Sequence, residues 1–182
     1  MTTQTALDQK TRPVVVDRIL IRHMNREDLR PLEWDGEYAH FRRQFQSVYR
    51  DYENGVAIPW VAVLPGSGEM LGQVFVLLES RFRPELANGQ MRAYLFSIRV
   101  KDPYRRQGVG GRLMDVAEDD LRARGYNTAT LNVARDNPDA HRFYVRRGYL
   151  VVAPEPGQWS YIDHRGRRQY VDEPAWRMEK AL

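Results

Sequence analysis

The stretch that decides the fold lies just past the middle of the chain and reads Arg105-Arg106-Gln107-Gly108-Val109-Gly110-Gly111. A strand-like segment, 94–100, precedes it, and a run with helical spacing, 108–124, follows it. At a helix N-terminus the backbone N–H groups face outward and the helix dipole adds positive potential. Glycines leave room there, and arginines offer forked donors to phosphate oxygens. The stretch therefore predicts a strand–loop–helix site for a phosphate group, with a tight turn that merely needs glycine as the alternative.

The spacing excludes two other phosphate-binding motifs. A P-loop needs Gly-x-x-x-x-Gly-Lys followed by Ser or Thr, and this stretch has no lysine. A dinucleotide-binding fingerprint needs Gly or Ala three residues after its second glycine, where this chain has Leu113. We therefore expect neither a nucleoside triphosphate nor a nicotinamide dinucleotide.

A second block follows some thirty residues later, Asn137-Pro138-Asp139-Ala140-His141-Arg142-Phe143-Tyr144-Val145-Arg146-Arg147-Gly148-Tyr149. Asn137 suits a helix N-cap and Pro138 the first helical position. With the strand Phe96-Ser97-Ile98-Arg99-Val100 and the glycine loop, this block resembles the two central motifs of the GNAT superfamily of acetyl-coenzyme A-dependent N-acetyltransferases. The resemblance covers about residues 93–150, and residues 175–180 resemble the family's closing strand.

The order of the expected elements agrees with that resemblance. We expect strands over 14–24, 58–64, 70–78, 94–100, 128–133, 149–152, 159–163, 168–171 and 175–179. Helical segments are expected over 26–52, with breaks near Pro31 and Gly36, over 108–124 and from Pro138 to a stop at Gly148. Hairpin-linked strands followed by strand–helix–strand–helix–strand indicate an α/β fold. The predicted fold has a mixed, partly splayed sheet of about six to seven strands with helices on both faces.

The resemblance implies acetyl-CoA as co-substrate and no metal. The pyrophosphate would lie on the glycine loop, and the pantetheine arm would run along the strand 98–100 where that strand splays from 128–133. A main-chain N–H near Ile98 would polarise the thioester carbonyl. Asn137 would bind pantetheine, serve as the helix cap, or do both. The implied cofactor-binding residues are Ile98, Arg99, Val100, Arg105, Arg106, Gln107, Gly108, Val109, Gly110, Gly111 and Asn137.

The resemblance also implies that Tyr144 is the general acid that protonates the leaving thiolate. Many relatives place the general base on the strand 94–100, but this strand has no carboxylate. Glu79, at the end of the preceding strand, is the nearest substitute and would act through a water; a solvated strand end is the alternative. Further candidates for the base are His40, Glu33 and Glu37, whereas His141 is expected to face solvent.

The acceptor site is expected to come from residues 30–56, 80–92 and 157–172. Trp34, Asp35, Tyr38 and Trp159 could present an aromatic and acidic surface to a cationic amine, or could simply pack in the core and on a helix surface. The expected activity is transfer of an acetyl group to a primary amine of a small molecule or protein by direct attack in a ternary complex. A non-catalytic acyl-CoA-binding sensor or interaction module with the same fold is the alternative.

The charge distribution agrees with an anionic ligand. The formal net charge is +4, and residues 99–147 hold 11 basic and seven acidic side chains, while the rest of the chain holds 17 of each. An arginine-biased genome would explain the abundance of arginine but not the place of the surplus. A nucleic-acid partner is not expected, because the two arginines precede a glycine turn rather than lie in a stripe with stacking aromatics.

Length and composition limit the class of protein. A chain of 182 residues suffices for one domain, and the absence of cysteine excludes disulfides, zinc-thiolate sites and a cysteine nucleophile. The longest apolar run, 56–64, is too short to span a membrane, and the first ten residues lack a signal-peptide pattern. We expect a cytoplasmic protein with a flexible tail over 1–13, one domain over 14–182, no membrane partner, and a homodimer through the C-terminal strands as one arrangement.

Overall fold

The computed structural model describes residues 18–182. The predicted tail over 1–13 and the first part of the strand predicted over 14–24 lie outside the described residues. Within them, the strands are β1 (Leu20–His23), β2 (Ala57–Val63), β3 (Met70–Leu77), β4 (Arg92–Val100), β5 (Thr128–Ala134), β6 (Leu150–Glu155), β7 (Gln158–Ile162), β8 (Arg168–Asp172) and β9 (Ala175–Ala181). The α-helices are α1 (Arg42–Glu53), α2 (Val109–Ala123) and α3 (Pro138–Arg146). Short 3-10 helices cover Arg26–Leu29, Pro31–Gly36, Ala39–Phe41 and Asp102–Tyr104. No helix in this part of the chain is long and apolar enough to cross a membrane.

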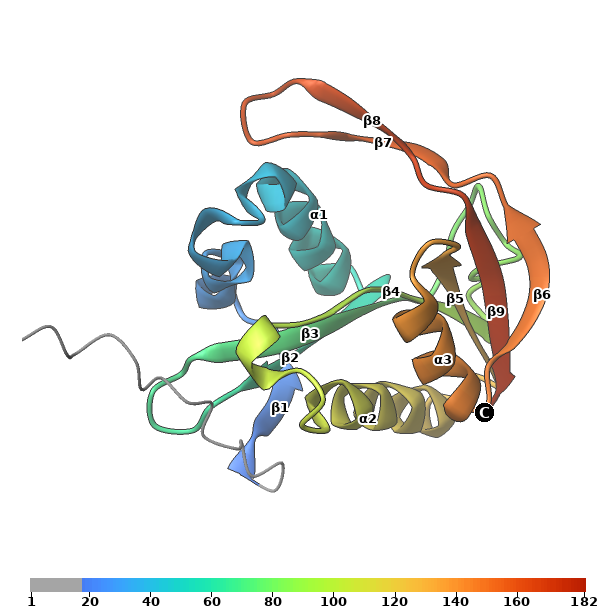
Figure 1. Ribbon diagram of the computed structural model, residues 1–182, viewed down its shortest axis with the longest axis horizontal. Helices are drawn as coiled ribbons and strands as arrows, with labels where there is room; N and C mark the ends of the chain where they lie inside the picture. The colour runs from blue at the N-terminus through green and yellow to red at the C-terminus, as the bar shows by residue number, and fades with distance from the viewer. Residues whose placement is uncertain (1–17) are drawn as a thin grey trace, which may run out of the picture.

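Seven of these strands form one mixed sheet, in the order β1-β2-β3-β4-β5-β9-β6 (Figure 1). β4 and β5 pair in parallel, because the chain returns between them through α2, and the other neighbouring strands pair antiparallel. β7 and β8 form a separate hairpin. The predicted mixed α/β sheet with helices is therefore confirmed.

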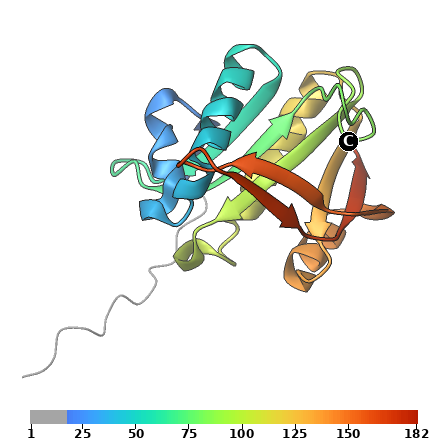
Figure 2. The ribbon, with the colours of Figure 1, turned by 90° about the horizontal axis from the view of Figure 1, so that it is seen from above.

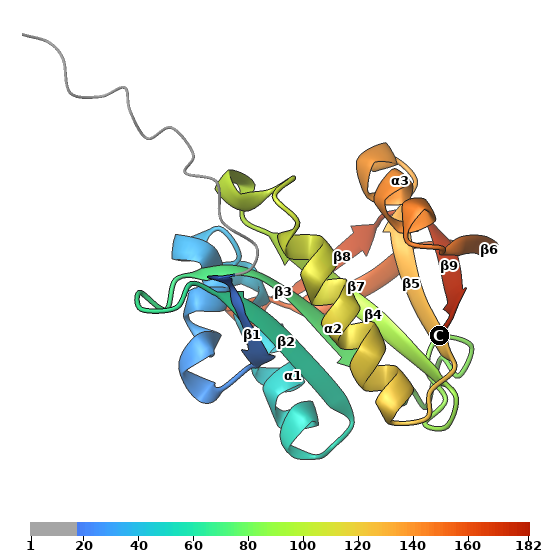
Figure 3. The ribbon, with the colours of Figure 1, turned by 90° about the horizontal axis from the view of Figure 1, so that it is seen from below.

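Helices cover both faces of the sheet, which is why β2 and β3 are buried along nearly their whole length. On one face, the larger apolar cluster joins Leu113 and Leu121 of α2 to Tyr144 of α3. On the other face, Phe45 and Val48 of α1 pack in a second cluster. Figure 3 shows α2 on the near face of the sheet and α1 behind it.

The predicted helical segment over 26–52 is confirmed with its breaks, since 3-10 helices precede α1. Trp34 (φ +45°), Asp35 (φ +57°) and Gly36 (φ +103°) are left-handed in succession at the second break. Two of these residues are not glycine, so the backbone is strained here. A bidentate ion pair beside the turn, from Arg42 to Glu33 at 2.5 and 2.7 Å, holds the strained turn against the start of α1.

The β7–β8 hairpin arches over the face of the sheet that carries α1 (Figure 1 and Figure 2). Its Trp159 ring stacks on Phe41 with 6.3 Å between centroids. The hairpin turn is closed by Asp163, which accepts N–H groups of Arg165 and Arg167 at 2.9 Å each. These backbone hydrogen bonds lower the pKa of the Asp163 carboxyl to about 2. The hairpin is therefore an ordered wall that faces α1.

Candidate active site

The parallel pairing of β4 and β5 stops halfway along both strands. Its last pair is Leu95 with Leu131, yet β4 runs on to Val100 and β5 to Ala134. Beyond that pair the two strands diverge, and no strand of the described part of the chain pairs with the edge of β4 that faces β5. This is the predicted splay of the sheet.

A bulge in β4 lies at the start of the divergence. Gln73 and Phe75 of β3, two residues apart, pair with Arg99 and Phe96 of β4, which are three apart. Ser97, inside the bulge, has φ +52°. An extra residue bends its strand and re-aims the neighbouring groups, so the bulge turns β4 away from β5.

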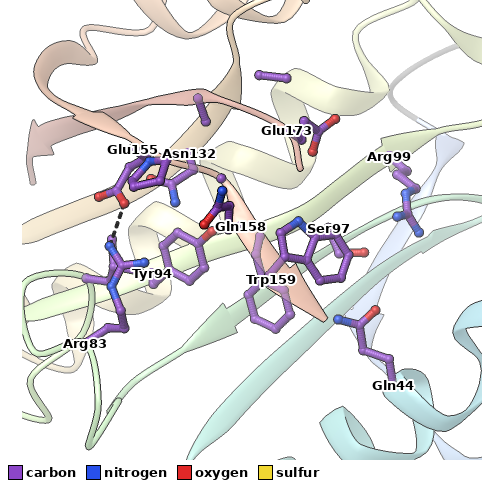
Figure 4. A pocket seen from close by; sticks show the side chains of 16 residues that line it. Gln44, Arg83, Tyr94, Ser97, Arg99, Asn132, Glu155, Gln158, Trp159 and Glu173 are labelled. Carbon is purple, nitrogen blue, oxygen red and sulfur yellow. Dashed lines mark hydrogen bonds and ion pairs between the residues drawn. The ribbon is translucent and has the colours of Figure 1, made fainter. Parts of the chain in front are cut away.

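A cavity of about 750 Å³ opens beside the split on the α1 face (Figure 4). Its walls include Tyr94 and Phe96 of β4, Asn132 of β5 and Trp159 of the hairpin. The Tyr94 and Phe96 rings stack with an interplanar angle of 3°. Burial raises the pKa of Tyr94 to about 12. The cavity thus has an aromatic floor, with Glu173 at its rim.

Two carboxylates line this cavity, and their environments differ. Glu155 is 5% exposed and receives Arg83 at 2.7 Å and Arg177 at 3.4 Å. Glu173 is exposed and forms no ion pair among residues 18–182. The side chain of Arg99 also lines the cavity, with its guanidinium over the Tyr38 ring.

The glycine loop lies on the opposite face, at the N-terminus of α2. Arg106 (φ +59°) and Gly108 (φ +86°) are left-handed on either side of Gln107. Alternating backbone handedness of this kind turns successive N–H groups toward one concave side, a nest for anions. The first helical hydrogen bond of α2 runs from Arg112 N–H to the Gly108 carbonyl at 3.0 Å, so the amides before it have no intrahelical acceptor.

Two glycines of the loop are not required by the protein's own packing. A Cβ at Gly110 would lie 3.5 Å from Val100 Cγ2 and 3.8 Å from Phe143 Cζ, which are ordinary contacts. A Cβ at Gly111 would meet only Arg147 Nη1, at 3.8 Å. The missing side chain at Gly111 leaves the surface of the helix N-terminus open, whereas a side chain at Gly110 would point toward Val100 and Phe143. The residues present therefore fit a ligand with closely approaching phosphates, such as coenzyme A.

The side chains of the loop make local contacts. Arg105 donates from Nε to the Val100 carbonyl at 3.0 Å and pairs with Asp102 at 2.9 Å. Arg106 is exposed, and Gln107 Nε2 donates to the Pro103 carbonyl at 2.7 Å. Arg105 thus covers a main-chain group that sequence reasoning assigned to pantetheine, and it would have to turn outward to reach a phosphate.

The remaining predicted cofactor residues lie between the loop and the split. The side chains of Ile98, Val100 and Val109 pack in the apolar cluster under α2, so only their main-chain groups are open to a ligand. Asn137 is exposed and caps α3, accepting the Ala140 N–H at 3.0 Å. Its predicted cap role is confirmed.

Tyr144 comes from α3 and is 7% exposed. Its ring packs against Phe143 and Tyr149 at 5.2 and 5.9 Å, and its phenol interacts electrostatically with Tyr94, which lines the cavity. Burial raises the pKa of the Tyr144 hydroxyl well above its usual value, so this group stays protonated at neutral pH. A protonated phenol that interacts with Tyr94 of β4 has a proton that it can donate.

Glu79 does not reach the cavity. β3 ends at Leu77, which pairs with Tyr94, and Glu79 then bridges to Asn88 in the following loop. There the side chain is exposed, and it packs against Gly89. It lies at a strand end, which was the alternative interpretation.

Of the other residues predicted as bases or as acceptor-binding residues, some pack within the fold and some lie at the cavity. Hydrogen bonds from Arg42 lower the pKa of Glu33, which makes it a poor base. Burial lowers the pKa of His40, whose ring packs on Phe41 at 4.2 Å. Trp34 is 6% exposed in the core, and Asp35 is exposed in the strained turn. Among the acceptor candidates, Trp159 lines the cavity and Tyr38 lies under Arg99.

Sequence reasoning missed several lining residues of the cavity: Tyr94, Asn132, Glu155 and Glu173. Asn132 gave a signal, since it is a polar residue within the apolar strand β5 and its Oδ1 is buried without a hydrogen-bond partner. The two glutamates gave none, because they lie at the ends of C-terminal strands whose position over the sheet is a tertiary feature.

The comparisons with known proteins agree with this geometry. Residues 26–149 match the profile of the acetyltransferase (GNAT) family. The fold resembles that of NAA60 of Arabidopsis thaliana in complex with acetyl-CoA, at TM-score 0.68 and 21% identity over 90% of this chain and 98% of that one. It also resembles the spermidine/spermine N-acetyltransferase SpeG of Vibrio cholerae, at TM-score 0.66 and 16% identity over 92% and 95%.

A search of curated protein sequences finds no match to the chain. The structural likenesses show the fold, whereas the family profile spans most of the sequence, including the glycine loop and the Tyr144 block. The chain therefore belongs to the GNAT family of acetyltransferases.

Proposed function

We propose that this protein transfers the acetyl group of acetyl-CoA to a primary amine of a small molecule or protein, by direct attack in a ternary complex. The observation that carries the proposal is the split between β4 and β5. An anion-binding helix N-terminus lies on one face of it, and a cavity of about 750 Å³ lies on the other. Two ligands that approach from opposite faces would meet at the bulge in β4.

Acetyl-CoA, when bound, supplies the acetyl group as a thioester. The amides of the loop 107–111 would hold its phosphates, with Arg105 and Arg106 beside them. Once Arg105 turns away from the Val100 carbonyl, the edge of β4 from Ile98 to Val100 would pair with the pantetheine arm as an added strand. A main-chain N–H of the bulge would polarise the thioester carbonyl.

The chain's residues would then handle two protons. The amine nitrogen forms a bond to the carbonyl carbon as the bond between that carbon and sulfur breaks. Tyr144, protonated and next to the split, donates its proton to the departing sulfur. The proton lost by the amine leaves through water toward a carboxylate. Glu173 suits that role better than Glu79, because Glu173 lines the cavity and has no ion-pair partner among the described residues.

The experiment measures thiol release from acetyl-CoA over a panel of amines, for the wild type and Tyr144→Phe. Loss of the phenolic proton should lower kcat by about 100-fold, within the usual range for general acid catalysis, with little change in the KM for acetyl-CoA. Tyr126→Phe is the matched control, since Tyr126 follows the C-terminal end of α2, does not line the cavity and should keep wild-type turnover.

The same experiment separates the enzyme from a binding module of the same fold. Tight binding of acetyl-CoA with no thiol release over the whole panel would favour a non-catalytic acyl-CoA sensor. Unchanged kcat in Tyr144→Phe would instead remove this residue from the mechanism. The cytoplasmic location stays a prediction, as does the homodimer, for which β6 offers an edge strand with exposed Leu150, Val151 and Val152.

A further inference from the structure

Arg99 brings a positive charge into the acceptor cavity. Side chains alternate along β4, so its neighbours Ile98 and Val100 pack under α2 while Arg99 projects to the α1 face. There its guanidinium carbon lies 4.3 Å from the Tyr38 ring centroid and 4.9 Å from that of Phe41. Figure 4 shows its side chain beside the aromatic walls of the cavity.

This guanidinium lacks an acidic partner within reach. Its Nη1 is buried and makes no hydrogen bond, and no ion pair involves Arg99 among residues 18–182. Glu37 and Glu173 favour its charge only electrostatically, from beyond ion-pair distance. The other arginine that lines the cavity, Arg83, is paired with Glu155 at 2.7 Å. Arg99 is therefore an unneutralised charge inside the site.

Arg99 is half-buried, and its Nη1 is out of contact with solvent. An unpaired charge that is partly removed from water is costly, and arginine does not escape the cost by deprotonating. Burial lowers the pKa of Arg99, which reflects the same cost. Tyr38 and Phe41 offset part of it through their ring faces. Stacking on a ring face also leaves the in-plane N–H groups available, in the fork geometry that matches a carboxylate.

We propose that Arg99 binds a carboxylate of the acceptor, so that the acceptor is an amine that also carries a carboxylate, as amino acids do. The inference rests on the proposed function and names its substrate class. It replaces the expected aromatic and acidic surface for a purely cationic amine, and a polyamine of the kind named for the Vibrio cholerae relative would be repelled. Glu173, also at the cavity, is placed to attract the amino end.

The walls narrow the class further. Tyr94, Phe96 and Trp159 present aromatic surface to the cavity, which favours an aromatic or large apolar side chain on the acceptor. Phenylalanine is therefore a suitable probe. Phenylalanine amide and phenethylamine keep its ring and its amine but lack the carboxylate.

The test compares kcat/KM for these three amines at saturating acetyl-CoA. The wild type should prefer phenylalanine to each of the other two by at least 10-fold. In Arg99→Gln the ratio of kcat/KM for phenylalanine to kcat/KM for either of the other amines should be close to 1, and Arg99→Lys should keep part of the preference. Arg124→Gln is the matched control: Arg124 is exposed and pairs with Asp120 at 2.9 Å on α2, so the wild-type ratio should persist. Thermal unfolding of each variant checks that the fold is intact.

A ratio of 1 or below in the wild type, or a ratio unchanged in folded Arg99→Gln, would overturn the inference and leave the proposed function standing. If no amine releases thiol, the proposed function fails. The role of Arg99 is then tested by measuring the Kd of N-acetylphenylalanine and of N-acetylphenethylamine for the protein in the presence of coenzyme A. Tighter binding of the acid by 10-fold or more, lost in Arg99→Gln, supports the inference, and equal or absent binding overturns it.

Discussion

At the scale of single residues, the site depends on which charges are neutralised by neighbours. Glu155 receives two arginines, whereas Glu173 receives none within ion-pair distance among the described residues. The same contrast separates Arg83, which is paired, from Arg99, which is not. Charged residues that form ion pairs within the protein stabilise the fold, whereas charged residues without an ion-pair partner are available to bind a substrate.

Exchanging single carboxylates tests this distinction. Glu173→Gln should lower kcat by about 10- to 100-fold, because it removes the free carboxylate nearest the acceptor. Glu79→Gln should leave kcat within about twofold, since that side chain is exposed at a strand end away from the cavity, where substitutions rarely matter. The measurement is thiol release at saturating substrates. If Glu79→Gln lowered kcat more than Glu173→Gln did, Glu79 rather than Glu173 would be the general base.

At the scale of elements, the starts of α2 and α3 are the features whose local structure the sequence predicted best. The glycine positions, the helix start and the Asn137 cap are local, and the structure has α2 and α3 where the spacing predicts them. The bulge at Ser97 was not predictable, because a left-handed serine inside a strand has no signal of its own. Its conformation depends on the pairing of β4 with β3.

Alanine at Gly110 should separate ligand binding from folding. The new methyl group makes ordinary contacts inside the protein, and alanine favours a helix over glycine by about 0.5–1 kcal/mol, so stability should hold or rise. The proposed phosphate site lies at the same helix N-terminus, so crowding by the added methyl should raise the Kd for acetyl-CoA at least tenfold, which corresponds to binding weaker by about 1.4 kcal/mol. Calorimetric titration and thermal unfolding give the two readouts.

Gly72→Ala is the contrasting control. Its Cβ would lie 2.6 Å from the Arg99 carbonyl oxygen, so this variant should lose stability. If Gly110→Ala lost stability as Gly72→Ala does, position 110 would need glycine for packing within the protein rather than for binding a ligand.

At the scale of the whole molecule, the sheet consists of two halves joined by a short parallel pairing. β1 to β4 form one half, and β5, β9 and β6 form the other. Besides the apolar cluster under α2, charged pairs connect them: Arg92 of β4 with Glu179 of β9, and Glu118 of α2 with Lys180 of β9 at 2.5 Å. Such connections compensate for the strand pairing lost at the split.

Glu118 is the most buried of these connections, at 2% exposure, and its oxygens meet Tyr149 and Arg147 besides Lys180. Glu118→Ala would remove the acidic partner of half-buried Lys180 and the acceptor of the buried Tyr149 hydroxyl, and it would leave Arg147 paired with Asp115 alone. The variant should therefore lower the free energy of unfolding by about 3 kcal/mol. Asp119→Ala, next to it but exposed, should cost at most about 1 kcal/mol. Denaturant unfolding measures both, and equal losses would contradict a special role for the buried carboxylate.

The sequence by itself determined most of the elements, their order and the glycine turn at the start of α2, because helix caps, glycine turns and apolar periodicity act between residues close together in the chain. It also pointed to Tyr144 through a motif. Only the tertiary structure decided that Glu79 lies outside the cavity, that Glu173 lines it, and that Arg99 lies in it without an acidic partner within ion-pair distance among residues 18–182. Those properties depend on which distant side chains meet across the split sheet, and the pairing of a buried charge is a property of its neighbours in space.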